Sequence, residues 1–140
     1  MSKNNKVLVL SEDDSRRRDL VTILDFIGEE QIVVGDEAKA LLGRGDDDSL
    51  ADILVAVVNG EDAGALDNLS LVCKCADGIP LLVVGDPSLK GLPDAVGARI
   101  ISRMEWPLNY TKFVDSLYRA QIFRDQFSRS QERGQQRGLQ

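Results

Sequence analysis

The stretch Asp-Ile-Leu-Val-Ala-Val-Val-Asn-Gly, from Asp52 to Gly60, decides the fold of this chain. Its interior, residues 53–58, is entirely apolar and mostly β-branched. A continuous apolar run of this kind, bounded by polar residues and glycine, is typical of a strand buried on both faces of a parallel sheet. Similar short runs occur at residues 7–10, 32–34, 81–84 and 100–101. The sequence therefore predicts five parallel strands.

Stretches with the apolar spacing of helices separate these strands. The expected helices run from Ser15 to Gly28, from Asp36 to Gly43 and from Leu66 to about Gly78. The segment between 84 and 100 is rich in proline and glycine, so it has room for only one or two helical turns. The last helix is expected to be the longest, capped by Asn109 and running from Tyr110 to about Arg133.

Five strand-then-helix units predict an α/β fold with a doubly wound, flavodoxin-like parallel sheet of strand order 2-1-3-4-5. In that topology, functional sites lie beyond the carboxyl ends of the first and third strands. The loops that follow Leu10, Val58 and Val84 are therefore the places to look for chemistry.

Length and composition set limits on the function. A chain of 140 residues with 43% hydrophobic residues fits one domain with a single core. The net charge of −6 argues against a nucleic-acid surface, which needs clustered Lys and Arg. No apolar run is long enough for a membrane span, and no signal peptide is recognisable, so a cytoplasmic location is expected.

Several kinds of site are disfavoured by the residues present. The chain contains no histidine, which removes histidine acid–base catalysis and histidine metal sites. Cys73 and Cys75 are separated by one residue, which is not a zinc-binding spacing, and they are expected to be reduced thiols on a helix. No cofactor is expected, because a flavin or nucleotide carrier on this fold needs a phosphate-binding loop rich in Ser, Thr and Gly after the first strand, and the loop here is mainly acidic.

The strand pattern resembles the receiver domains of response regulators. The resemblance implies an acidic pair after strand 1 that holds Mg²⁺, a phosphoacceptor aspartate after strand 3, a hydroxyl after strand 4 and a lysine before a proline after strand 5. The positions that match these parts are Ser11 and Glu12, Val57, Gly85 and Trp106, the last of which precedes Pro107.

These residues predict a degenerate phosphorylation site. A valine has no oxygen to phosphorylate, and the amide of Asn59 is a poor nucleophile. A register shift of one residue would pair Glu12 with Asp13, which keeps a metal site open as an alternative. The alternative to a receiver that cannot be phosphorylated, a silent receiver, is an active receiver that is phosphorylated on another acid of the same loop, Glu61 or Asp62. Both acids lie past the expected acceptor position.

Three segments narrow the resemblance further: residues 15–29, 80–87 and 115–124. Together they are similar to the N-terminal receiver-like domain of the sigma-54-dependent master regulators of flagellar genes. This resemblance implies a non-catalytic regulatory domain that acts on a downstream ATPase domain of the same protein. The expected organisation is a receiver-like domain at 1–122 and a helical linker at 123–140.

The last helix is predicted to mediate self-association, most simply as a homodimer. Its apolar residues fall on one stripe at helical spacing: Phe113, Leu117, Ala120, Phe123 and Phe127. The first two are expected to pack on the sheet. The two C-terminal phenylalanines are expected to extend past their own domain and to need a partner.

Overall fold

A computed structural model describes residues 5–28, 31–44, 50–86 and 89–138, with side chains described as far as Ser130. The chain alternates strands and helices. In order, the elements are β1 (Lys6–Leu10), α1 (Asp14–Ile27), β2 (Gln31–Val34), α2 (Gly35–Arg44), β3 (Ile53–Asn59), α4 (Ala65–Cys75), β4 (Leu81–Val84), α5 (Asp94–Gly97), β5 (Ile100–Met104) and α6 (Tyr110–Gly138).

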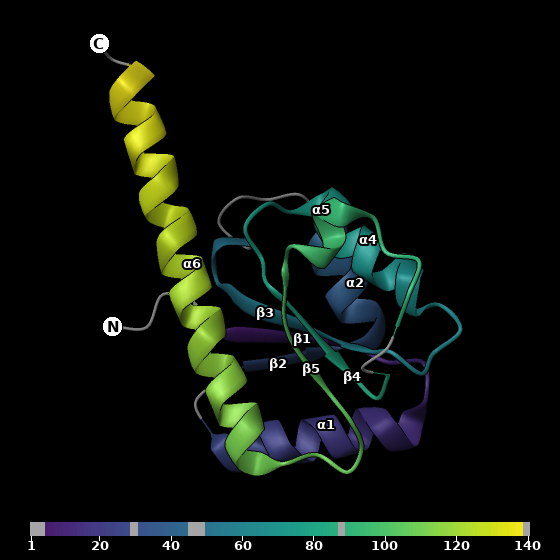
Figure 1. Ribbon diagram of the computed structural model, residues 1–140. Coiled ribbons are helices and arrows are strands. Elements are labelled where there is room, and N and C mark those ends of the chain that lie inside the picture. Colours follow the sequence, from purple (N-terminus) through teal and green to yellow (C-terminus); the bar gives the residue numbers. More distant parts are fainter. Residues whose placement is uncertain (1–4, 29–30, 45–49, 87–88, 139–140) are drawn as a thin grey trace.

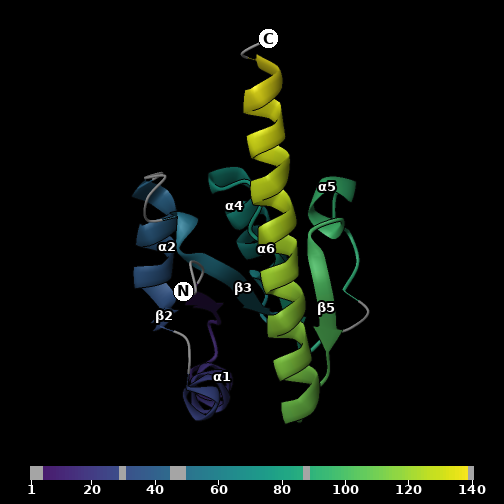
Figure 2. The ribbon, with the colours of Figure 1, turned by 90° about the vertical axis from the view of Figure 1, so that its left-hand side faces the viewer.

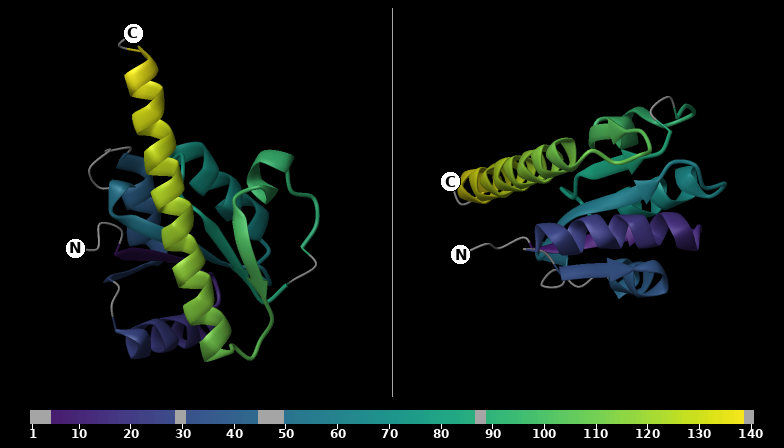
Figure 3. Two further views of the ribbon diagram at one scale, coloured as in Figure 1. Left: turned by 60° about the vertical axis from the view of Figure 1, so that its left-hand side comes forward. Right: turned by 90° about the horizontal axis from the view of Figure 1, so that it is seen from below.

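The strands form one parallel sheet of order β2-β1-β3-β4-β5, which confirms the predicted topology. Helices α1 and α6 cover one face, and α2, α4 and α5 cover the other (Figures 1 and 3). Every residue of β3 is buried, because side chains that alternate along a central strand meet a helical layer on each side.

The core divides into two clusters across the sheet. Val9 and Val57 point towards α1 and α6, where they pack with residues such as Phe113. Leu10 and Val58 point to the other face, towards α2 and α4. The expected short helix before β5 is confirmed, since α5 has only four residues.

Two details of the helices differ from the predictions. Helix α1 is capped by Asp13, not Ser15, because an Asp13 carboxylate oxygen accepts a hydrogen bond from the Arg16 N–H at 3.1 Å. Helix α4 ends at Cys75, short of the predicted Gly78, and it buries Asn68 while Leu66 is 38% exposed. Cys73 and Cys75 lie on α4 as free cysteines, as predicted.

Helix α6 begins where the sequence predicts and continues further. Asn109 caps it, accepting a hydrogen bond from the Lys112 N–H at 3.1 Å. Its C-terminal part projects beyond the sheet (Figures 1 and 2). The predicted division between residues 122 and 123 falls inside this continuous helix and does not coincide with a structural break.

Candidate functional site

The carboxyl ends of β1, β3, β4 and β5 meet at one edge of the sheet, and the residues that follow them form the candidate site. Val57 is not at this edge. It pairs with Val9 two residues before the end of β3, and its side chain is fully buried in the core. Asn59, which points to the same face as Val57, ends the strand beside Ser11. The acceptor position is therefore corrected from Val57 to Asn59.

Asn59 is held by a closed set of hydrogen bonds. Its Nδ2 donates to Ser11 Oγ at 3.3 Å and to Asp62 Oδ1 at 3.0 Å. Its Oδ1 accepts from the Glu61 N–H at 3.1 Å. With 1% of its surface exposed and both amide protons used, Asn59 joins β1 to the loop after β3. This role needs an amide, because a carboxylate could not donate to Ser11 or Asp62.

Asp62 lies at the centre of an acidic group. Its Oδ2 accepts a hydrogen bond from the Glu12 N–H at 2.7 Å, which lowers its pKa. Burial has the larger effect and raises the pKa of Asp62 above 3.8, and the nearby charges of Glu12, Asp13 and Glu61 raise it further. The site therefore concentrates negative charge where a receiver would have to accept a phosphoryl group.

The raised pKa of Asp62 predicts a pH-dependent effect of Asp62→Asn. The pKa of Asp62 in the folded protein is higher than its unfolded value of 3.8, because the folded state disfavours the charged carboxylate. Ionisation of Asp62 therefore destabilises the fold, and the loss of stability develops as the pH rises from 3.8 through the folded pKa. The variant should gain stability relative to wild type as the pH rises from 3.8 through the folded pKa. Urea unfolding across this range measures the difference, and a gain that does not change with pH would contradict the assignment.

Gly85 stands where a receiver would carry its hydroxyl, and Trp106 stands where it would carry its lysine. Gly85 has a φ of 105°. A Cβ added there would lie 2.6 Å from Trp106 Nε1 and 3.1 Å from Asn59 Oδ1. The indole therefore occupies space that only glycine leaves open. The Arg16 guanidinium lies 4.3 Å from the Trp106 ring centre and forms an ion pair with Glu61 at 3.3 Å, so these side chains cover the site.

Restoring a hydroxyl at this position should therefore be costly. Gly85→Thr is expected to lower the free energy of unfolding by about 2–4 kcal/mol, from backbone strain and the clash with Trp106. In the background of Trp106→Lys, which removes the indole, the cost should become smaller, because only the backbone strain of about 1–2 kcal/mol and the contact with the flexible Glu61 side chain remain. Equal costs in both backgrounds, measured by a double-mutant cycle, would show that the two residues are not coupled.

The structure does not bring Glu12 and Asp13 together as a metal-binding pair. Asp13 caps α1, while the Glu12 carboxylate lies against Gly64, before α4. Within the part of the chain that the structure describes, no three Cys, Asp or Glu side chains are grouped so that they could hold a metal ion.

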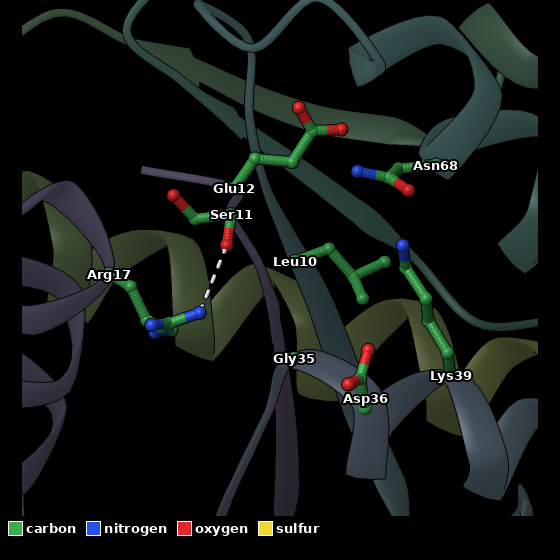
Figure 4. A pocket seen from close by; sticks show the side chains of 8 residues that line it. All are labelled: Leu10, Ser11, Glu12, Arg17, Gly35, Asp36, Lys39 and Asn68. Atoms are coloured by element: carbon green, nitrogen blue, oxygen red, sulfur yellow. Dashed lines mark hydrogen bonds between the residues drawn. The ribbon is translucent and has the colours of Figure 1, made fainter. Parts of the chain in front are cut away.

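A pocket of about 290 Å³ opens beside Ser11. It is lined by residues of β1, α1, α2 and α4, which carry both signs of charge: Leu10, Ser11, Glu12, Arg17, Gly35, Asp36, Lys39 and Asn68. In Figure 4 the Asn68 amide and the Lys39 ammonium point towards the same space beside Leu10. The Arg17 guanidinium donates to the Ser11 carbonyl at 3.5 Å and closes one side.

The stripe predicted on α6 is largely part of the core. Phe113, Leu117 and Ala120 are buried against the sheet. Phe123 and Phe127 are half-buried, so the expectation that they lack cover in their own domain is wrong. The Phe127 ring lies against Gly78, where a Cβ would collide with it.

Arg124 on α6 has a structural role that the sequence analysis did not predict. It is 7% exposed, and its guanidinium donates to the carbonyl oxygens of Gly78 at 2.8 Å, Ala51 at 3.1 Å and Leu50 at 3.4 Å. These carbonyls precede β4 and β3, at the edge opposite the candidate site. Arg124 therefore connects the protruding helix to the amino ends of two central strands.

Structures with this fold include a putative pilus assembly-related protein from Burkholderia pseudomallei, with a TM-score of 0.66, 25% identity and coverage of 88% of this chain and 93% of that one. A CheY-like receiver domain protein from Methanospirillum hungatei gives a TM-score of 0.66 and 15% identity, over 86% and 98% of the two chains. Chemotaxis protein CheY4 from Vibrio cholerae gives a TM-score of 0.60 and 18% identity, over 84% of this chain and 98% of that one. These likenesses show a CheY-like receiver fold.

None of the helices in the described ranges is both long and apolar enough to cross a membrane. Residues 6–122 match the family described as flagellar regulatory protein FleQ, and this range covers the whole sheet and the first part of α6. The receiver fold and the family match over most of the chain together identify a receiver-like domain of a regulator. The chain therefore belongs to the flagellar regulatory protein FleQ family.

Proposed function

We propose that this domain regulates flagellar transcription without being phosphorylated. In the proposal it is a cytoplasmic, non-enzymatic domain that self-associates and modulates a downstream ATPase domain of a sigma-54-dependent activator. The observation that carries the proposal is Asn59 at the acceptor position, with both of its amide protons donated to neighbouring side chains.

The rest of the site supports the same proposal. A transferred phosphoryl group needs positive charge to stabilise it, and a receiver obtains this from a metal ion and a lysine. Here Trp106 stands in place of the lysine. The acids Glu12 and Asp62 lie beside the acceptor position, and their charges would oppose an incoming anion.

The second candidate is an active receiver that is phosphorylated on Asp62. It is favoured by the position of this carboxylate, which contacts Asn59 and the backbone of Glu12 inside the site. Against it stand the raised pKa of Asp62 and its acidic neighbours. Glu61 is a weaker choice, because its carboxylate forms an ion pair with Arg16 towards the surface.

Sedimentation equilibrium over a concentration series tests the regulatory proposal. The domain is expected to self-associate at micromolar concentrations. Its dissociation constant should be the same with and without Mg²⁺ and beryllofluoride, which mimics a phosphoryl group on an acceptor carboxylate. A monomer at all concentrations would contradict the proposed self-association. A shift in the constant on addition of beryllofluoride would instead favour the active receiver.

A further inference from the structure

The pocket beside Ser11 contains a buried polar side chain, that of Asn68 on α4. Asn68 is 5% exposed, and its backbone N–H donates to the Gly64 carbonyl oxygen at 2.9 Å. Its side-chain amide forms no hydrogen bond with any residue that the structure describes. A buried amide left unpaired destabilises a fold, and few such groups occur in native structures. In Figure 4 the amide points into the pocket beside Leu10, so a molecule bound in the pocket can satisfy it.

Three charged side chains of the same pocket resemble Asn68 in this respect. Among the described residues, nothing forms an ion pair or a hydrogen bond with the Lys39 ammonium or with the carboxylates of Glu12 and Asp36. Arg17, the fourth charged residue of the lining, already forms an ion pair with Asp14, which lies outside the pocket. The pocket therefore presents one ammonium and two carboxylates to a bound molecule.

The size and position of the pocket fit a small molecule. Its volume of about 290 Å³ is at the lower end of the range for ligand pockets, about 300–1,000 Å³. Since liquid water occupies about 30 Å³ per molecule, the pocket has room for roughly ten non-hydrogen atoms. It lies on the α2 and α4 side of β1, where Leu10 joins the core, and neither Asn59 nor Trp106 lines it. It is therefore separate from the acceptor position.

We propose that this pocket binds a basic α-amino acid of about the size of lysine. The carboxylate of the ligand pairs with the Lys39 ammonium, and its two ammonium groups pair with Glu12 and Asp36. In Figure 4 these two carboxylates lie on opposite sides of the Lys39 ammonium and the Asn68 amide, which suits a ligand with a cation at each end. The Asn68 amide hydrogen-bonds the ligand, and the methylene chain lies along Leu10. The inference goes beyond the proposed function and does not depend on it.

Charge selects this class of ligand over simpler ions. An anion would meet the Glu12 and Asp36 carboxylates, and a diamine would leave the Lys39 ammonium without a counter-charge; both leave like charges together. A divalent metal ion would need several oxygen ligands, and the described residues bring no three Cys, Asp or Glu side chains together for one. Only a molecule with both an ammonium and a carboxylate group pairs every free charge of the pocket.

The first test is an NMR titration of the ¹⁵N-labelled protein at constant ionic strength, followed at the side-chain amide of Asn68. The probes are L-lysine, cadaverine, which lacks the carboxylate, and 6-aminohexanoate, which lacks the α-ammonium group. L-lysine should shift the Asn68 signal with a dissociation constant of about 1 mM or below, and each analogue should bind at least about 10-fold more weakly.

Each other outcome overturns part of the inference. No saturable shift with any probe up to about 10 mM would mean that the pocket holds only water, and would overturn the site. Cadaverine or 6-aminohexanoate binding as tightly as L-lysine would overturn the proposed ligand class, because one of the three ion pairs would then contribute nothing.

Variants test which residues form the site. Lys39→Met should weaken L-lysine binding by about 10-fold or more, whereas Lys74→Met, at an exposed lysine of α4 outside the pocket, should leave it unchanged. Equal affinities in these two variants would overturn the role of Lys39 and with it the site.

Asn68→Leu separates ligand binding from a structural role. It replaces an unpaired buried amide with an apolar group of similar size, so the Tm without ligand should stay the same or rise while L-lysine binding falls by about 10-fold or more. A lower Tm together with unchanged binding would mean that the amide serves the fold alone, and would overturn the inference.

Discussion

Val57→Asp is expected to unfold much of the protein at neutral pH and not to create a phosphorylation site. Val57 is fully buried between the sheet and the α1–α6 layer. A carboxyl there has no cation or hydrogen-bond donor, and the loss of stability should be about 3–5 kcal/mol or more. That is a large part of the stability of a domain of this size. Urea unfolding followed by circular dichroism measures it.

The matched control is Asn59→Asp, which puts the same group on the same face of β3 two residues later. There the new carboxylate keeps the Glu61 N–H as a hydrogen-bond donor, but it also meets the Asp62 carboxylate. Its cost should be smaller and should decrease at acidic pH, where the two carboxyls can share a proton. If Val57→Asp proved the milder of the two, the register assigned to β3 would be wrong.

Arg124→Met is the second substitution expected to have a large effect. It keeps an unbranched apolar side chain in place but removes the donors to the carbonyl oxygens of Gly78, Ala51 and Leu50. The free energy of unfolding should fall by about 2–4 kcal/mol, since buried acceptors without partners each cost about 1–3 kcal/mol. Burial also lowers the pKa of Arg124, with the charge of Arg99 acting in the same direction, and this desolvation partly offsets the loss.

The control for Arg124→Met is Arg119→Met, less than two helical turns away on the exposed side of α6. Its ion pair with Asp115, at 3.0 Å, is open to solvent, so the change should be below about 0.5 kcal/mol. Hydrogen exchange should also show faster opening of the backbone near Gly78 in Arg124→Met alone. Similar losses in the two variants would mean that Arg124 does not hold α6 to the sheet.

The architecture was predictable because it depends on patterns that are local in sequence. Each strand is a short apolar run, and five such runs separated by helices leave few topologies. The short α5 followed from glycine and proline alone. The family resemblance was also visible, because it extends over most of the chain.

The site was predicted less well, for two physical reasons. An apolar run shows that a strand exists but not at which residue it ends. The end of β3 was placed two residues too early, at Val57 instead of Asn59. Because a shift of two residues leaves a side chain on the same face of the sheet, the predicted face was correct but the role of Asn59 was missed. Long-range contacts leave no local pattern. A charged residue at position 124 looks like a solvated one until the fold brings carbonyls from residues 50–51 and 78 to it.

The proposed silent receiver is tested most directly by intact-mass spectrometry of the wild-type domain after incubation with acetyl phosphate and Mg²⁺. The expected result is an unchanged mass, because Asn59 offers no nucleophilic oxygen and Trp106 supplies no compensating charge. Asn59→Asp should also remain unlabelled, since it restores the acceptor without the lysine. A gain of one phosphoryl group by the wild type, abolished by Asp62→Asn, would contradict the proposal and establish the domain as an active receiver.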